Sequence, residues 1–227
     1  MAEEEKKAGL LPDSEQLEAY AKRIQEFVRA NQKTIIMAAS AFVLLVVIIS
    51  GVIYFQKKAE EKAQALLGGA IAQIEAASRS EAADSRYAEI KPELKKIIDQ
   101  YGDTDAGKAA RLKYADLCYQ TGDYEKAVAM YRGALAAYSN DPDLRQLILN
   151  GLGYAHENKG DYAKAAECFR RIVKEDDAVM KDQALFNLGR VYGRMGKAEK
   201  QQEAYEQLVS DYPDSMYYQL AKEKLAA

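Results

Sequence analysis

The sequence contains LGYAHENKGDYAKAAECF at residues 152–169, and the second half of this stretch occurs three times. GDYAKAAECF (160–169) returns as GDYEKAVAMY at 122–131 and, less closely, as GKAEKQQEAY at 196–205. The copies begin at glycines that are 38 and 36 residues apart. Similarity at a fixed period of this length indicates a repeat architecture, in which each unit buries its apolar face against its neighbours.

Small and aromatic residues keep fixed distances from the three glycines. The small residues stand seven positions before each glycine, at Ala115, Gly153 and Gly189, and the aromatic residues stand nine positions after it, at Tyr131, Phe169 and Tyr205. Two antiparallel helices approach closely where small side chains face each other, and an aromatic ring fills the space beside them. The pattern therefore predicts helix hairpins with Ala127 and Ala165 at two of the contacts, and a more open pair where Gln201 replaces the alanine.

A second internal similarity extends the array in both directions. IIDQYGDTDAGKAARLKYA, from Ile97, parallels LVSDYPDSMYYQLAKEKLA, from Leu208. Residues 66–101 are therefore expected to form a degenerate first repeat, in which Pro92 either kinks the second helix or marks its first turn. After Pro213, Asp214 or Ser215 is expected to cap a last helix that covers the end of the stack.

An uncharged run of 22 residues, TIIMAASAFVLLVVIISGVIYF, extends from Thr34 to Phe55. As an α-helix it would be about 33 Å long, which matches a bilayer hydrocarbon core of about 30 Å. A core helix of a soluble domain would have a polar face, and a cleaved signal peptide would have a shorter apolar region followed by a small-residue cleavage site. The run therefore predicts an uncleaved signal anchor.

The residues beside this run indicate its surroundings. Four basic residues lie in the 20 positions before it and three in the 20 positions after it, which predicts a cytoplasmic N-terminus and periplasmic repeats. Residues 1–12 are charged and predicted to be disordered. An amphipathic helix follows, which lies on lipid headgroups or binds a partner, with apolar residues at Leu17, Tyr20, Ile24, Phe27 and Val28. Beyond the run a helix should continue to about Ala77, weakened by Gly68–Gly69, with a stripe of Ala63, Leu66, Leu67, Ala70, Ile71 and Ile74.

Composition and motifs exclude several functions. The formal net charge is −3, with 32 basic and 35 acidic residues, so no nucleic-acid partner is expected. The sequence has no glycine-rich phosphate loop, zinc-protease motif or haem motif, which predicts a protein that is not an enzyme and has no cofactor or small-molecule substrate. His156, the only histidine, stands at a packing position, so no metal site is expected. Cys118 and Cys168 fall on helices of different repeats and are predicted to be unbridged.

The pattern L-G-x-x-Y…G-D-Y-x-x-A-x-x-x-[YF] resembles the tetratricopeptide repeat, as LGYAHENKGDYAKAAECF and, less fully, YADLCYQTGDYEKAVAMY. The third copy keeps the Gly196, Tyr205 and Pro213 positions. This resemblance implies that the first helix of each hairpin lines a concave groove for extended protein segments. The groove positions that it implies here are Asp116, Tyr119, Asn150, Tyr154, Phe186, Arg190 and Arg194.

The whole layout resembles the YfgM-like family, ancillary subunits of the bacterial Sec translocon. That resemblance implies an inner-membrane scaffold whose partners are translocon components, periplasmic chaperones or translocated polypeptides. The C-terminal YEQLVSDYPDSMYYQLAKEKL is also similar to repeats of cell-division coordinators and outer-membrane assembly proteins, which leaves a structural role in the envelope open.

The expected fold is all-α: an N-terminal amphipathic helix, one transmembrane helix and an α-solenoid of tetratricopeptide-like hairpins with a C-terminal capping helix. The expected parts are a cytoplasmic tail (1–33), the transmembrane helix (34–55), membrane-proximal helices with the degenerate repeat (56–101), and the repeats with the capping helix (102–227).

Overall fold

The computed structural model describes residues 14–80 and 83–226, and the stretch predicted to be disordered (1–12) lies outside them. The prediction of an all-α fold is confirmed. In the described ranges the helices are α1 (Ser14–Ala30), α2 (Gln32–Ser78), α3 (Ala83–Tyr101), α4 (Asp105–Gln120), α5 (Tyr124–Ala137), α6 (Pro142–Asn158), α7 (Tyr162–Lys174), α8 (Lys181–Arg194), α9 (Ala198–Asp211) and α10 (Tyr218–Ala226).

The first compact unit contains α1 and the apolar start of α2, as far as Lys57. The apolar stripe of α1 is exposed along its whole length, from Leu17 to Val28. Helix α2 has 47 residues, and its most apolar window has a mean hydropathy of 2.8 with none of it buried. By length and composition it is able to cross a membrane.

The second unit begins at Lys58 and contains the rest of α2. Helix α2 continues through Gly68–Gly69 and buries Ala63, Leu67 and Ala70 in the core of the array. Leu66 was predicted to belong to this stripe, but it is 46% exposed. Helix α3 starts at Ala83, so Pro92 lies inside the helix and does not mark its first turn.

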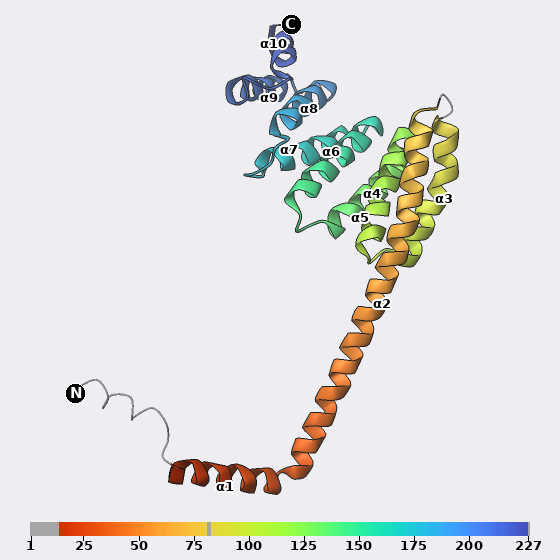
Figure 1. Cartoon of the computed structure of the whole chain (residues 1–227). Helices are drawn as coiled ribbons and strands as arrows, with labels where there is room; N and C mark the ends of the chain where they lie inside the picture. The colour runs from red at the N-terminus through yellow and green to blue at the C-terminus, as the bar shows by residue number, and fades with distance from the viewer. Residues whose placement is uncertain (1–13, 81–82, 227) are drawn as a thin grey trace, which may run out of the picture. The chain divides into compact units, whose positions relative to one another are not determined.

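Helices α4 to α9 form three consecutive hairpins, α4–α5, α6–α7 and α8–α9, and each hairpin packs on the next (Figure 1). The turn inside each hairpin carries a glycine with positive φ: Gly122 at 77°, Gly160 at 83° and Gly196 at 67°. In each turn the N–H of the following residue donates to the carbonyl five residues back, as from Asp161 to His156 at 2.8 Å. This is the Schellman arrangement, which favours glycine because the left-handed conformation clashes with a Cβ.

The predicted contact between small and aromatic residues is confirmed in two hairpins. A Cβ added to Gly153 would lie 2.6 Å from Cε1 of Phe169, and one added to Gly189 would lie 2.4 Å from Cε1 of Tyr205. Phe169 is fully buried and Tyr205 is 2% exposed. The aromatic ring of each second helix therefore lies directly on the backbone of the first helix, where only glycine leaves room.

The array ends at α10, which packs on α9 through a small apolar cluster that includes Leu185, Tyr205 and Ala221. The predicted cap residue Ser215 does not start the helix. Its hydroxyl accepts from the backbone N–H of Tyr217 (3.0 Å) and donates to Asp182 (2.6 Å), and the helix begins three residues later, at Tyr218. Ser215 thus connects this last segment to α8.

Candidate functional site

The first helices of the hairpins, α4, α6 and α8, form one side of the array, which we call the first-helix face. All seven predicted groove residues lie on these three helices. Side-chain hydrogen bonds join neighbouring helices: Asn158 on α6 donates to the hydroxyl of Tyr119 on α4 (3.1 Å), and Asn187 on α8 donates to the hydroxyl of Tyr154 on α6 (2.9 Å). Residues more than 30 positions apart in the sequence therefore form a single surface.

The buried side chain of Asn187 lies at the centre of these contacts. Its amide nitrogen donates to the Tyr154 hydroxyl and, at 3.5 Å, to the side-chain oxygen of Asn150. Its own oxygen accepts from Nη2 of Arg190 at 3.1 Å. Asn187 is only 2% exposed, whereas Tyr154 and Arg190 are half-buried. The structure therefore brings three of the predicted residues together around one buried amide.

A second contact fixes the position of Arg190. Its Nη2 lies 2.9 Å from Oε2 of Glu157, and its guanidinium carbon lies 5.5 Å from the centre of the Tyr154 ring. Burial raises the pKa of the Glu157 carboxyl, and the positive charges of Arg190 and Arg194 oppose that rise. Oε2 of Glu157 is buried and accepts no hydrogen bond of good geometry within the described chain, so its charge is balanced mainly through the ion pair. Arginine over an aromatic face adds a cation–π attraction.

The predicted residues on α4 differ from one another in their contacts. Tyr119 is half-buried beside Tyr124, with ring centroids 5.7 Å apart, and burial raises the pKa of its hydroxyl. Asp116 instead accepts a hydrogen bond from the buried hydroxyl of Tyr131 at 2.7 Å, and burial together with this carboxylate raises the Tyr131 pKa. Asp116 therefore serves the packing of its own hairpin, while Tyr119 faces the next one.

The two remaining predicted residues lie on α8. Phe186 stacks on Tyr217 with ring centroids 5.2 Å apart and contacts Tyr205, so it belongs to the apolar cluster at the C-terminal end. Arg194 is exposed in the last turn of α8 and contributes its charge near Glu157. Neither residue hydrogen-bonds to the Asn187 network within the described chain.

Sequence reasoning missed Asn187 and Glu157. Asn187 lies between Leu185 and Leu188, in a run of buried positions, and a polar residue at such a position marks a place where a buried amide needs partners. Glu157 follows Tyr154 by three residues, the spacing that places two side chains on one side of a helix. These two signals were available in the sequence.

The other candidate groups do not take part in the contacts around Asn187. His156 is 2% exposed, its Nδ1 lies 3.3 Å from Asp161, and burial lowers its pKa, which fits a structural role. Cys118 and Cys168 are free and buried, on α4 and α7. Among the described residues no group of three or more His, Cys, Asp or Glu is arranged to hold a metal ion.

The fold and the site define a helix-hairpin solenoid with a polar and aromatic face on its first helices. Residues 25–227 match the tetratricopeptide repeat-like domain family, and the chain belongs to this family. Repeats of this kind generally bind protein partners and are typically non-catalytic scaffolds.

A solved structure supports the same fold. The chain is similar to the crystal structure of nearly identical tetratricopeptide-like repeats of a putative kinesin light chain from Podosopora anserina, with a TM-score of 0.55. The two sequences are 16% identical, and the match covers 68% of this chain and 82% of that chain. It is also similar to MamA, with a TM-score of 0.49, 20% identity and coverage of 63% and 80%. At this identity the first likeness establishes the fold alone. No curated protein matches the sequence.

Proposed function

We propose that this chain is a membrane-anchored scaffold that binds proteins on its first-helix face. The observation that carries the proposal is the arrangement of Tyr154 and Arg190. Both side chains remain partly accessible, and both hydrogen-bond to the buried Asn187. Arg190 is also held by its ion pair with Glu157. Fixed aromatic and arginine side chains are the groups that dominate protein interfaces, because little entropy is lost when a partner binds them.

The chemistry of this face suits an extended polypeptide. Tyr119 and Tyr154 offer flat apolar surfaces with a hydroxyl at the edge, and Arg190 and Arg194 offer donors for backbone carbonyls or carboxylates. These groups extend over three successive first helices, so a bound segment would contact several repeats at once.

The anchor is the apolar run at the start of α2. We infer that residues 34–55 span the inner membrane, with 1–33 in the cytoplasm and the helices of 56–101 and 102–227 in the periplasm. The small excess of basic residues before the run supports this orientation. Helix α2 contains both the run and the buried Ala63, Leu67 and Ala70, so the connection to the array is short. A short tether raises the effective concentration of a weak binding face, to about millimolar.

The particular role that we propose is that of a YfgM-like subunit of the Sec translocon, which links emerging polypeptides to periplasmic chaperones. The support is the layout: a short N-terminal amphipathic helix, one apolar helix, and an array that ends in YPDS and a capping helix. The alternative is a structural or coordinating protein of cell division or outer-membrane assembly, which the same C-terminal segment resembles.

In vivo photo-cross-linking tests both the proposed binding face and the proposed partners. A photo-reactive amino acid at Tyr154 should capture translocon subunits, periplasmic chaperones or emerging chains. The same residue at Glu223, which is exposed on α10, serves as the control and should not capture them. Capture of division or outer-membrane assembly proteins at Tyr154 would favour the alternative role. Capture of partners only at Glu223 would reject the first-helix face as the binding surface.

A further inference from the structure

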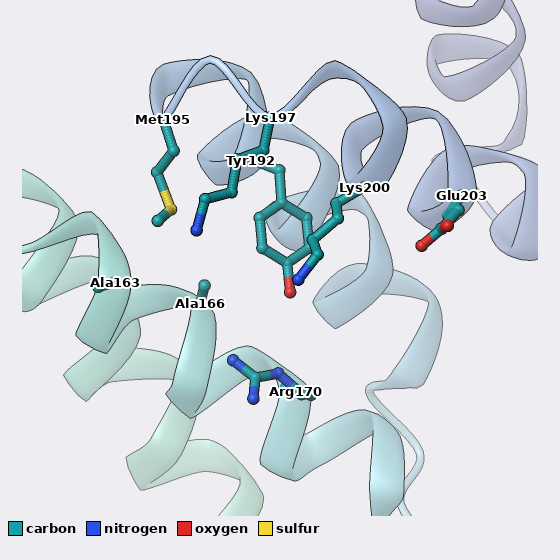
Figure 2. Close-up of a pocket in the computed structure, with 8 residues that line it drawn as sticks. All are labelled: Ala163, Ala166, Arg170, Tyr192, Met195, Lys197, Lys200 and Glu203. Atoms are coloured by element: carbon teal, nitrogen blue, oxygen red, sulfur yellow. The ribbon is translucent and has the colours of Figure 1, made fainter.

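Three cationic side chains surround a pocket that is lined mainly by second helices of the array (Figure 2). The pocket has a volume of about 360 Å³ and lies between α7 and α9. Arg170 comes from α7, Lys197 and Lys200 come from the start of α9, and Glu203 lies at the edge. The three cations form no ion pair within the described chain, and Lys200 lies 6.0 Å from the centre of the Tyr192 ring. The pocket includes none of the seven predicted groove residues.

A smaller pocket of about 160 Å³ lies one repeat earlier, and its lining includes Arg132 from α5 together with Lys164 and Arg171 from α7. It also includes one carboxylate, Glu167. Lys164 is 55% exposed, and its nearest carboxylate, that of Asp161, is 3.7 Å away. Each pocket thus has three cations and one anion, a net charge of 3 − 1 = +2, on a chain whose formal charge is −3.

The two pockets are built from equivalent positions of the repeat. The arginines are ten residues after Gly122 and Gly160, the lysines are four after Gly160 and Gly196, and the glutamates are seven after the same two glycines. The ring on the floor also corresponds, since His156 and Tyr192 are each four residues before their glycine. Packing of a hairpin needs the small and aromatic positions, and it does not need charges at these exposed positions.

The third hairpin shows that the charged positions do not simply follow the packing positions. It departs from the packing pattern at Gln201, where the first two hairpins have a buried alanine, and yet it keeps Lys200 and Glu203 on either side. The charged positions therefore recur where the core position does not. The cations of the larger pocket form no ion pair within the described chain, and exposed cations of this kind repel one another and are ordinarily interspersed with anions.

We propose that these two pockets together form a second docking site, which binds an acidic, extended polypeptide segment on the second-helix side of the array. Two carboxylate side chains of the segment would enter the two pockets, on either side of α7. A lone phosphate fits less well, because each pocket also presents a carboxylate that repels a dianion more strongly than a monoanion. Methyl groups of Ala163 and Ala166 line the larger pocket and suit the methylene groups of a glutamate.

A direct test uses the full chain in a mild non-ionic detergent and fluorescein-labelled decaglutamate as the probe, with fluorescence anisotropy as the readout. Arg170→Gln with Lys200→Gln should weaken the Kd about tenfold, since two exposed charge contacts are lost. Arg132→Gln with Lys164→Gln should have a similar effect. Lys222→Gln with Lys224→Gln removes two exposed charges from α10 and is the matched control, with an expected change below about twofold.

A gain-of-binding variant excludes misfolding as an explanation. Glu167→Gln with Glu203→Gln removes one repelling carboxylate from each pocket and should tighten the Kd by about three- to tenfold. Equal weakening in the α10 control, or no tightening in this variant, would overturn the proposal. Displacement of the peptide by millimolar phosphate at constant ionic strength would reassign the pockets to that ion and also overturn it. Tyr154→Ala should leave decaglutamate binding unchanged. The proposed second site is therefore tested separately from the first-helix face.

Discussion

Replacement of Gly189 by alanine tests the register of the repeats at a single atom. The added Cβ would lie 2.4 Å from Cε1 and 2.6 Å from Cζ of Tyr205. Carbon atoms in contact are optimally about 3.5–4.0 Å apart, so the overlap is about 1 Å. Tyr205 is 2% exposed and contacts Phe186 at a centroid distance of 5.8 Å, so the ring has little room to move away.

The expected change in stability follows from two opposing terms. Overpacking of a close-packed core destabilises by about 1–3 kcal/mol, and an overlap with three ring atoms, Cδ1 at 2.7 Å included, lies in the upper half of this range. Alanine returns up to about 1 kcal/mol through its higher helix propensity. The free energy of unfolding should therefore fall by about 1–2 kcal/mol, which lowers the melting midpoint of a unit of this size by about 2–8 °C.

Thermal unfolding of residues 58–227, followed by circular dichroism, measures this shift on the compact second unit. Gly68→Ala is the matched control, because no atom lies within 4 Å of its added Cβ, and it should raise the midpoint. In a Tyr205→Leu background Gly189→Ala should lose most of its effect, since the two positions are coupled. An unchanged or higher midpoint for Gly189→Ala alone would refute the packing argument.

Three further predictions concern charges. Glu60 accepts from the backbone N–H of Asp105 at the start of α4 (2.8 Å), so Glu60→Gln should lower the unfolding free energy by about 0.5–1 kcal/mol in urea titrations, while the exposed Glu61→Gln should not. Burial raises the pKa of Cys168 to about 11. Between pH 9.0 and 11 the folded state therefore keeps the thiol proton while the unfolded state loses it, so the free energy of unfolding should fall as the pH rises. Cys168→Ala should reduce this fall by up to roughly 2–3 kcal/mol in urea titrations across that range. Arg190→Gln leaves the Glu157 carboxylate buried without its counter-ion, so the free energy of unfolding should fall by about 1–3 kcal/mol at about pH 7. The loss should be smaller at about pH 4, where the carboxyl is protonated. An equal loss at both pH values would contradict the ion-pair argument.

The hairpin fold was predictable because its requirements act on single residues at fixed offsets. A turn with positive φ needs glycine at Gly160, and a ring against a backbone needs glycine at Gly153, whatever the rest of the chain does. Leu66 could not be placed in this way. Helical periodicity gives a broad apolar stripe, and the width that is buried depends on which helix packs against it.

Gln201 shows why residue size alone misleads. The sequence predicts a more open hairpin because a long side chain stands where alanine is expected. In the structure the facing residue is Gly193, and a Cβ added there would lie 2.9 Å from the Gln201 side-chain oxygen. The facing glycine therefore supplies the room that the alanine supplies in the other hairpins. The space available to a core side chain depends on the residue that faces it, and a single sequence does not show which positions face each other.

The candidate site was predictable in outline only, because helical position is local whereas hydrogen bonding across helices is not. The resemblance to the tetratricopeptide repeat places Asn150, Tyr154 and Arg190 on the first-helix face, and the structure brings these three together. The same reasoning placed Asp116 there, where its partner is instead the buried Tyr131 of its own hairpin. Which polar side chain is bound inward depends on the neighbour that reaches it.

The buried amide of Asn187 connects folding to the proposed function. Stability alone would favour an apolar residue at this position, since a buried amide contributes little even when all its hydrogen bonds are made. Its partners are Tyr154 and Arg190, and the arginine side chain in particular has many rotamers in the absence of such contacts. Ordering them when the chain folds reduces the entropy that a partner must overcome when it binds. A polar core position that adds little to stability, but orders two partly accessible side chains, is the arrangement that the proposed binding face requires.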